Sequence, residues 1–120
     1  MVAGKLDFII RLARSGGAEL AEELKYDASY ISRIRNGKRI PPDIDTILEK
    51  TAGFLAGRIT SEEQKLIAKK VVLADAGEWP EDENAIKTAI MNWFRQPGEI
   101  DPEDAELVRK LPRAKRKNSR

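Results

Sequence analysis

The residues of this chain best suited to specific chemistry lie in the short segment 28–35 and just after it. Two apolar residues, Ile31 and Ile34, fall on one side of a helix in this segment. The other side carries hydroxyl, guanidinium and amide groups, at Ser29, Ser32, Arg33 and Asn36. Donors and acceptors at this spacing can read the edges of base pairs. The pattern therefore favours recognition of a nucleic acid by hydrogen bonds.

A basic cluster overlaps the same helix and continues beyond it. No acidic residue interrupts the cations at Arg33, Arg35, Lys38 and Arg39. A duplex attracts such a cluster because each neutralised phosphate releases counterions. Arg35 falls nearer the apolar side of the helix. An ion pair with Asp27 or with an acid of the next helix is therefore as well supported as a contact with DNA. A plain helical hairpin with a solvated basic face is the alternative for residues 18–39.

The composition argues against several classes of site. Histidine and cysteine are both absent, which removes the usual general base, the commonest metal ligands and any disulfide framework. No apolar run approaches the roughly 18 residues that span a bilayer, and Asp7 interrupts the first apolar stretch, unlike a secretory signal. We therefore expect a cytoplasmic protein that is not an enzyme, holds no metal or cofactor and does not enter a membrane.

The elements that must position these residues are predicted to be helices. Apolar residues recur at helical spacing, and no alternating strand pattern is present. The spacing predicts an all-α fold with helices at residues 5–14, 18–24, 28–35, 44–55, 62–76, 81–95 and 102–111. Helix starts are predicted at an Asp27 N-cap, at a capping box of Thr60 with Glu63 and at Asp101-Pro102. Left-handed glycine is expected to end the first helix within Ser15–Gly17, and Asn36-Gly37 to end the third.

The second half of the chain differs in charge from the first. Residues 61–112 carry seven basic and twelve acidic side chains, whereas residues 113–120 carry five basic and no acidic ones. Residues 60–111 are predicted to form a helical extension, and its apolar stripe from Ile86 to Phe94 is a candidate surface for dimerisation or for a partner protein. Trp79, Trp93 and Phe94 are interpreted as core or as dimer interface. The end of the chain, 112–120, is predicted to be a disordered basic tail.

Residues 17–40 resemble the helix-turn-helix of the phage-repressor family of DNA-binding domains (Cro/lambda-repressor type, XRE-like). The residues that carry the resemblance are apolar or small where the helices cross and polar or basic afterwards: Leu20, Ala21, Leu24, Ile31, Ile34, Asn36, Gly37 and Lys38. The turn position that is usually glycine is Lys25 here, which costs on the order of 1 kcal/mol if its φ is positive. The resemblance covers about residues 5–56 and implies a five-helix type of domain, which we assign to residues 1–58.

The resemblance also implies that the helix 28–35 lies in the major groove of double-stranded DNA. Arg33 would then bind a guanine, with about 1–3 kcal/mol of discrimination, and Lys38 would hold a phosphate. Tyr30 would touch the backbone or pack on the preceding helix. The positions implied to contact DNA are Gly17, Ala18, Ala28, Ser29, Tyr30, Ser32, Arg33, Asn36, Lys38 and Arg39.

These observations predict a sequence-specific DNA-binding transcriptional regulator, a repressor that acts by occupying an operator. A homodimer is expected, because a single helix-turn-helix reads only a few base pairs. The alternative is an antitoxin-like or adaptor protein that binds a partner protein through residues 60–111. A small metal-dependent nuclease built on carboxylates is the enzymatic alternative.

Overall fold

The structure is a computed structural model that describes residues 2–38 and 40–111. The described residues form α1 (Val2–Leu12), α2 (Gly17–Leu24), α3 (Ala28–Arg35), α4 (Ile44–Ala56), α5 (Glu62–Val71), α6 (Glu83–Arg95) and α7 (Pro102–Arg109). They contain no strand, so the predicted all-α fold is confirmed for this part of the chain. No helix within these ranges is long and apolar enough to cross a membrane. The predicted tail, 112–120, lies outside the described residues.

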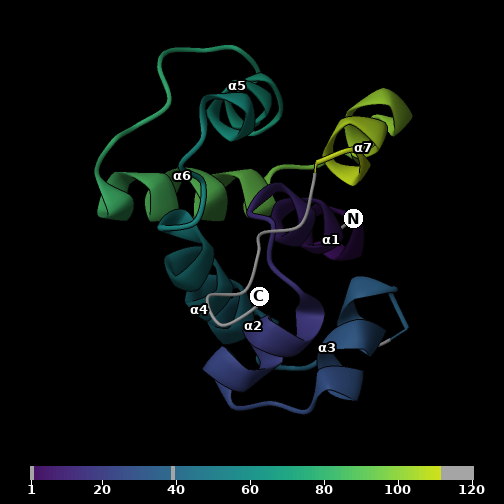
Figure 1. Ribbon diagram of the computed structural model, residues 1–120. Coiled ribbons are helices and arrows are strands. Elements are labelled where there is room, and N and C mark those ends of the chain that lie inside the picture. The colour runs from purple at the N-terminus through teal and green to yellow at the C-terminus, as the bar shows by residue number, and fades with distance from the viewer. Residues whose placement is uncertain (1, 39, 112–120) are drawn as a thin grey trace, which may run out of the picture.

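The helices form three levels along the molecule (Figure 1). The α2–α3 pair lies at one end, α5 and α7 lie at the other, and α1, α4 and α6 lie between them. The central helix α6 packs across α4, and α1 contacts α3, α4, α5, α6 and α7. Helix α1 therefore connects the part of the chain that resembles a helix-turn-helix with the helices that follow it.

One hydrophobic cluster extends through all three levels. It includes Leu6 of α1, Ile31 of α3 and Ile90 of α6, whose side chains are completely inaccessible to solvent, and it reaches Val108 of α7. Burial of such side chains is the main favourable term in folding. Because residues far apart in the sequence share this cluster, the first and second halves of the chain stabilise each other.

The apolar stripe of α6 belongs to this core. Ile86, Ile90, Trp93 and Phe94 are all buried within the chain itself, and the Trp93 ring lies 5.8 Å from the ring of Phe8 in α1. The suggestion that the stripe from Ile86 to Phe94 is a free dimerisation surface is therefore wrong. The hydrophobic face of α6 is covered by α4 and α1 of the same chain and not by a second copy. Trp79 is buried as well, in agreement with the core interpretation of these aromatic residues.

Helix α5 is shorter than predicted and buries a partly polar face. It ends at Val71 and not near residue 76, because Ala74 and Asp75 adopt positive φ angles of 51° and 62°. Leu66 is apolar but 71% exposed. The buried face is formed by Gln64, Ile67 and Ala68. The spacing of apolar residues alone therefore does not identify the buried face of this helix, because one of its members is polar.

Two helix starts differ from prediction in their side-chain bonds. The capping box of α5 is formed one residue later than predicted, with Ser61 Oγ accepting from Gln64 N–H and Gln64 Oε1 accepting from Ser61 N–H. Asp27 is the N-cap residue of α3, but its carboxylate accepts no capping hydrogen bond. By contrast, Asp101 caps α7 as predicted, with Glu103 N–H donating to Oδ1 at 3.1 Å.

The end of α1 uses an arginine where a glycine was predicted. Arg14 has a φ of 59°, and the N–H groups of Arg14 and Ser15 donate to the carbonyls of Arg11 and Ile10. This is the Schellman pattern of helix termination, in which glycine is the common left-handed residue. Gly16 is extended because it is already the N-cap residue of α2. The short connection therefore forces the left-handed turn onto Arg14.

Candidate nucleic-acid interface

The crossing of α2 and α3 is built from the small and apolar residues that the sequence places there. Leu20, Ala21 and Leu24 of α2 and Ile31 and Ile34 of α3 are buried. Ala21 is small enough to let the two helices approach closely. The predicted bounds of α3 agree with the structure, and those of α2 differ by one residue.

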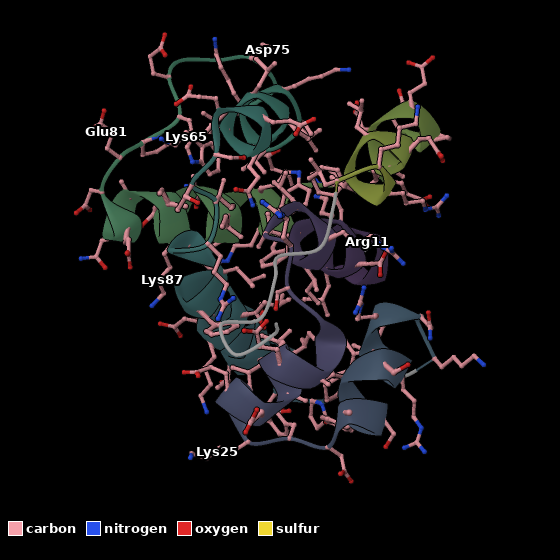
Figure 2. All side chains as sticks on the ribbon, viewed as in Figure 1. Arg11, Lys25, Lys65, Asp75, Glu81 and Lys87 are labelled. Atoms are coloured by element: carbon pink, nitrogen blue, oxygen red, sulfur yellow. The ribbon has the colours of Figure 1, made fainter. Side chains whose placement is uncertain are left out.

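The turn between α2 and α3 is a left-handed helix end at Lys25. Its φ and ψ are 64° and 42°, and Tyr26 N–H donates to the Ala21 carbonyl at 2.9 Å. The φ of Lys25 is thus positive although the residue is not glycine. The turn therefore carries the strain of a side chain in the left-handed region, about 1–2 kcal/mol. The Lys25 side chain points outward at the α2–α3 end of the molecule (Figure 2).

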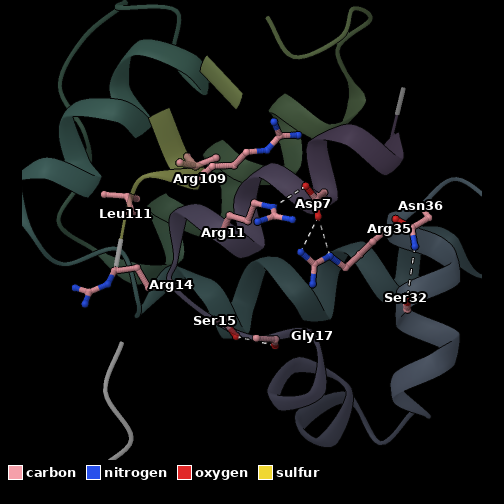
Figure 3. A pocket seen from close by; sticks show the side chains of 12 residues that line it. Asp7, Arg11, Arg14, Ser15, Gly17, Ser32, Arg35, Asn36, Arg109 and Leu111 are labelled. Carbon is pink, nitrogen blue, oxygen red and sulfur yellow. Dashed lines mark hydrogen bonds and ion pairs between the residues drawn. The ribbon is translucent and has the colours of Figure 1, made fainter. Parts of the chain in front are cut away.

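The outer face of α3 is open to solvent. Ala28, Ser29, Ser32 and Arg33 are all exposed. Within the described part of the chain, no ion pair engages the Arg33 guanidinium. Asn36, which ends the helix, is also exposed, and its Nδ2 lies 3.4 Å from Ser32 Oγ (Figure 3). The face opposite Ile31 and Ile34 therefore offers hydroxyl, amide and guanidinium groups together, as the spacing predicted.

The chain leaves α3 through a glycine that adopts the left-handed conformation. Gly37 has a φ of 73°, and Lys38 N–H donates to the Arg33 carbonyl at 2.9 Å. The Lys38 side chain is exposed beside the end of the helix. Arg39, the next predicted phosphate ligand, lies outside the described residues. Gly37 is the left-handed stop that the sequence predicted here.

Tyr30 is only half-buried and packs beside the turn. Its ring centroid lies 5.3 Å from that of Tyr26, whose hydroxyl lies 3.3 Å from Asp43 Oδ2. Partial burial and the Asp43 carboxylate both raise the pKa of the Tyr26 hydroxyl. Tyr30 therefore packs against a side chain of the turn that follows α2, while part of its surface stays accessible.

Arg35 is directed away from the open face and into an ion pair. Its Nη2 lies 2.6 Å from Asp7 Oδ1, and the other oxygen of the same carboxylate lies 2.9 Å from Arg11 Nε (Figure 3). The predicted pairing of Arg35 with Asp27 or with an acid of α4 is therefore wrong: Arg35 does form an ion pair, but its partner is Asp7 of α1. This contact fixes α3 against α1.

The first turn of α2 presents backbone donors beside this ion pair. Its first intrahelical bond runs from Leu20 N–H to the Gly16 carbonyl at 3.1 Å, and Gly16 supplies no side-chain cap. The N–H groups of Gly17 and Ala18 are therefore oriented for an acceptor outside the helix. A Cβ atom on Gly17 would lie 2.9 Å from Arg35 Nη1, so a side chain at this position would require the Arg35 guanidinium to shift.

Sequence reasoning confined to residues 17–39 missed three arginines that lie near this interface. Arg11 and Arg14 come from α1 and the turn after it, and Arg109 comes from α7; all three line one cavity with Ser32 and Asn36. No local motif connects them, because the tertiary packing of α1 and α7 is what brings them together. The lining of this cavity could not be read from spacing along the chain.

Comparisons of the chain with protein-family models, with curated proteins and with solved structures found no match.

Proposed function

We propose that this protein is a sequence-specific DNA-binding transcriptional regulator that acts by occupying an operator. The observation that carries the proposal is the exposed face of α3, where Ser29, Ser32 and Arg33 lie opposite the buried Ile31 and Ile34. Hydroxyl and guanidinium groups on one helix face suit base edges in the major groove. The backbone N–H groups of Gly17 and Ala18 and the Lys38 ammonium would hold phosphates on either side.

The test is selection of bound sequences from a random pool of DNA duplexes, carried out with the wild type and with Arg33→Ala. The wild type is expected to enrich a defined site. Arg33→Ala is expected to lose about 1–3 kcal/mol of discrimination at one guanine position while keeping residual, salt-sensitive binding.

Two matched variants separate base reading from phosphate binding. Lys38→Ala should weaken binding similarly for all sequences and reduce the salt slope by about 1. Arg95→Ala removes an exposed arginine from the far helix α6 and should change neither property. The proposal fails if the wild type enriches no sequence, or if Arg33→Ala and Arg95→Ala have the same effect.

Two copies reading a symmetric site are part of the proposal, since one helix-turn-helix supplies limited specificity. The apolar stripe of α6 is buried in the core of the chain. The two copies must therefore contact each other through another surface, or bind side by side only on the DNA. Light scattering of the protein alone and with a selected duplex distinguishes these cases. One copy per selected duplex would contradict the two-copy arrangement.

An antitoxin-like or adaptor role is the second candidate. The observation that favours it is Leu66, an apolar side chain on α5 that is 71% exposed. If residues 60–111 bind a partner protein, co-expression with the protein encoded by the neighbouring gene should yield a complex. Leu66→Gln should weaken that complex, whereas Arg33→Ala should not. Failure of the two proteins to co-purify would remove this candidate.

A further inference from the structure

A polar cavity of about 320 Å³ lies where α1, α2, α3 and α7 meet. Its wall includes Arg11, Arg14, Arg35 and Arg109, together with Asp7 and the backbone at Gly17. Figure 3 shows Arg11 and Arg35 converging on Asp7 inside this region. A volume of this size is at the lower end of the range for small-molecule sites.

The charges around the cavity are unbalanced. Among the described residues that line it, Arg11, Arg35 and Arg109 accompany a single acidic residue, Asp7. The single Asp7 carboxylate is shared by two guanidiniums, with Arg11 Nε at 2.9 Å and Arg35 Nη2 at 2.6 Å. One negative charge cannot neutralise both partners. The excess of positive charge favours an anion at this position.

Arg109 and the backbone of α2 increase this excess. Arg109 has Glu106 as a partner at 3.4 Å, but both side chains are more than half exposed, and such surface pairs contribute little. The start of α2 at Gly17 adds the positive end of the helix dipole and N–H groups that no side chain caps. The Arg35 guanidinium lies close to that same helix start, so its positive charge adds to the positive end of the helix dipole.

Arg14 contributes a second, conformational argument. It occupies the left-handed position at the end of α1, with a φ of 59°. Glycine would adopt this conformation without strain, yet the chain has an arginine whose side chain lines the cavity. Residues held in strained conformations cluster at binding sites, where the side chain serves a purpose that the strain opposes.

We propose that this cavity binds a phosphate group, held by the guanidiniums of Arg14, Arg35 and Arg109 and by the first N–H groups of α2. Guanidiniums match the oxygens of a phosphate with paired, charge-assisted hydrogen bonds. The phosphate comes either from a free phosphorylated compound or from the backbone of a bound nucleic acid. The site includes α1 and α7 and therefore extends beyond the α3 face that carries the proposed function.

The first experiment titrates the full-length protein with inorganic phosphate at constant ionic strength, with chloride as the balancing anion. The backbone NMR signals of Gly17 and Ala18 are expected to shift and saturate. Arg14→Gln and Arg109→Gln should each weaken this binding about tenfold, while Arg95→Gln, which removes an exposed arginine outside the cavity, should not.

The second experiment measures the salt dependence of duplex binding for the same variants. If the phosphate is a backbone phosphate, Arg14→Gln and Arg109→Gln should each reduce the salt slope by about 1, and Arg95→Gln should leave it unchanged. Saturable binding of free phosphate or this change in slope supports the site and identifies the source. The proposal is overturned if phosphate causes no saturable shift and the slopes are unaltered.

These experiments distinguish failure of the proposed DNA-binding function from failure of the phosphate site. Saturable phosphate binding by a protein that selects no duplex would keep the cavity site and discard the DNA-reading role.

A final variant, Arg14→Gly, separates loss of the site from loss of the fold. Because glycine relieves the left-handed strain, it should raise the melting temperature by about 2–5 °C and still weaken phosphate binding about tenfold. Unchanged phosphate affinity in this variant would exclude Arg14 from the site.

Discussion

At the scale of single residues, Lys25 shows what the sequence of a turn does to stability. It occupies a left-handed position with a φ of 64°. We predict that Lys25→Gly stabilises the protein by about 0.5–1 kcal/mol. Relief of the left-handed strain, about 1–2 kcal/mol, exceeds the roughly 0.5–1 kcal/mol that glycine costs through the entropy of the unfolded chain. Urea denaturation measures the difference.

The matched control for this prediction is Lys38→Gly. Lys38 is also an exposed lysine after a helix, but its φ is not positive. There, glycine brings only its entropic cost, so the free energy of unfolding should fall slightly. Equal effects of the two substitutions would show that the left-handed conformation of Lys25 carries no strain.

Lys5 is a buried cation with a structural role. Its side chain is 4% exposed, its Nζ donates to the Trp93 carbonyl at 2.7 Å and to the Gln96 carbonyl, and it lies 5.4 Å from the centre of the Trp93 ring. It thus satisfies carbonyls at the C-terminal end of α6, where a positive charge is favoured. Burial lowers the pKa of this ammonium below its usual 10.5.

A pH dependence follows from this shift. Between the folded pKa of Lys5 and 10.5, the unfolded chain binds more protons than the folded one, so the contribution of Lys5 to stability rises with pH. We predict that the free energy of unfolding of the wild type, relative to Lys5→Met, increases as the pH is raised through this window. Urea denaturation of both chains from pH 8 to pH 10.5 measures it. A difference that decreases with pH would mean that the two carbonyls outweigh the effect of burial.

At the scale of elements, Gln64 connects α5 to the rest of the molecule. Its side chain is 2% exposed. Nε2 donates to the carbonyls of Leu12 and Arg58 at 2.8 and 2.9 Å, and Oε1 accepts from Thr60 and Ser61 N–H. One amide therefore joins the end of α1, the segment after α4 and the start of α5. Such a fully satisfied buried group fixes one arrangement of these elements.

We predict that Gln64→Leu destabilises the protein by about 2–4 kcal/mol. Leucine has a similar size, but it leaves two buried carbonyls and the capping N–H groups without partners. Thermal or urea unfolding measures the loss. Leu66→Gln on the same helix is the matched control; because Leu66 is exposed, its effect should stay within about 0.5 kcal/mol. Similar losses for the two variants would refute the role of the Gln64 hydrogen bonds.

At the scale of the whole molecule, the shared core decides whether the first half of the chain can fold alone. Helix α4 packs across α6, and Phe8 of α1 packs on Trp93. A chain that ends at Gly57 would expose these surfaces. We predict that it loses cooperative unfolding, which calorimetry and the dispersion of NMR signals would reveal.

The control for the truncation is a chain that ends at Leu111. It retains every described residue of the core and should unfold cooperatively, like the full chain. If the chain ending at Gly57 unfolds cooperatively with a similar free energy of unfolding, then α5, α6 and α7 are not needed for folding. Such a result would contradict the mutual stabilisation inferred from the shared cluster.

The structure also shows which parts of the fold could be predicted. The bounds of α3 were predicted without error because its information is local: two apolar residues at helical spacing, an N-cap position at Asp27 and the Asn36-Gly37 stop. The exposed face with Ser29, Ser32 and Arg33 follows from the same spacing. By contrast, the capping box of α5 was predicted one residue too early, because Thr60 with Glu63 and Ser61 with Gln64 both fit the local pattern. The structure uses the second pair, and the Gln64 side chain also donates to the Leu12 carbonyl, 52 positions away along the chain.

The sequence by itself determined the apolar faces of α3 and α6 and the side chains that α3 turns to solvent, because helical periodicity depends only on neighbouring residues. It did not determine what covers each apolar face. Only the tertiary structure placed the α6 stripe inside the core, paired Arg35 with Asp7 and gathered the arginines of α1, α3 and α7 around one cavity. These contacts join distant segments, and they depend on how all the helices pack together.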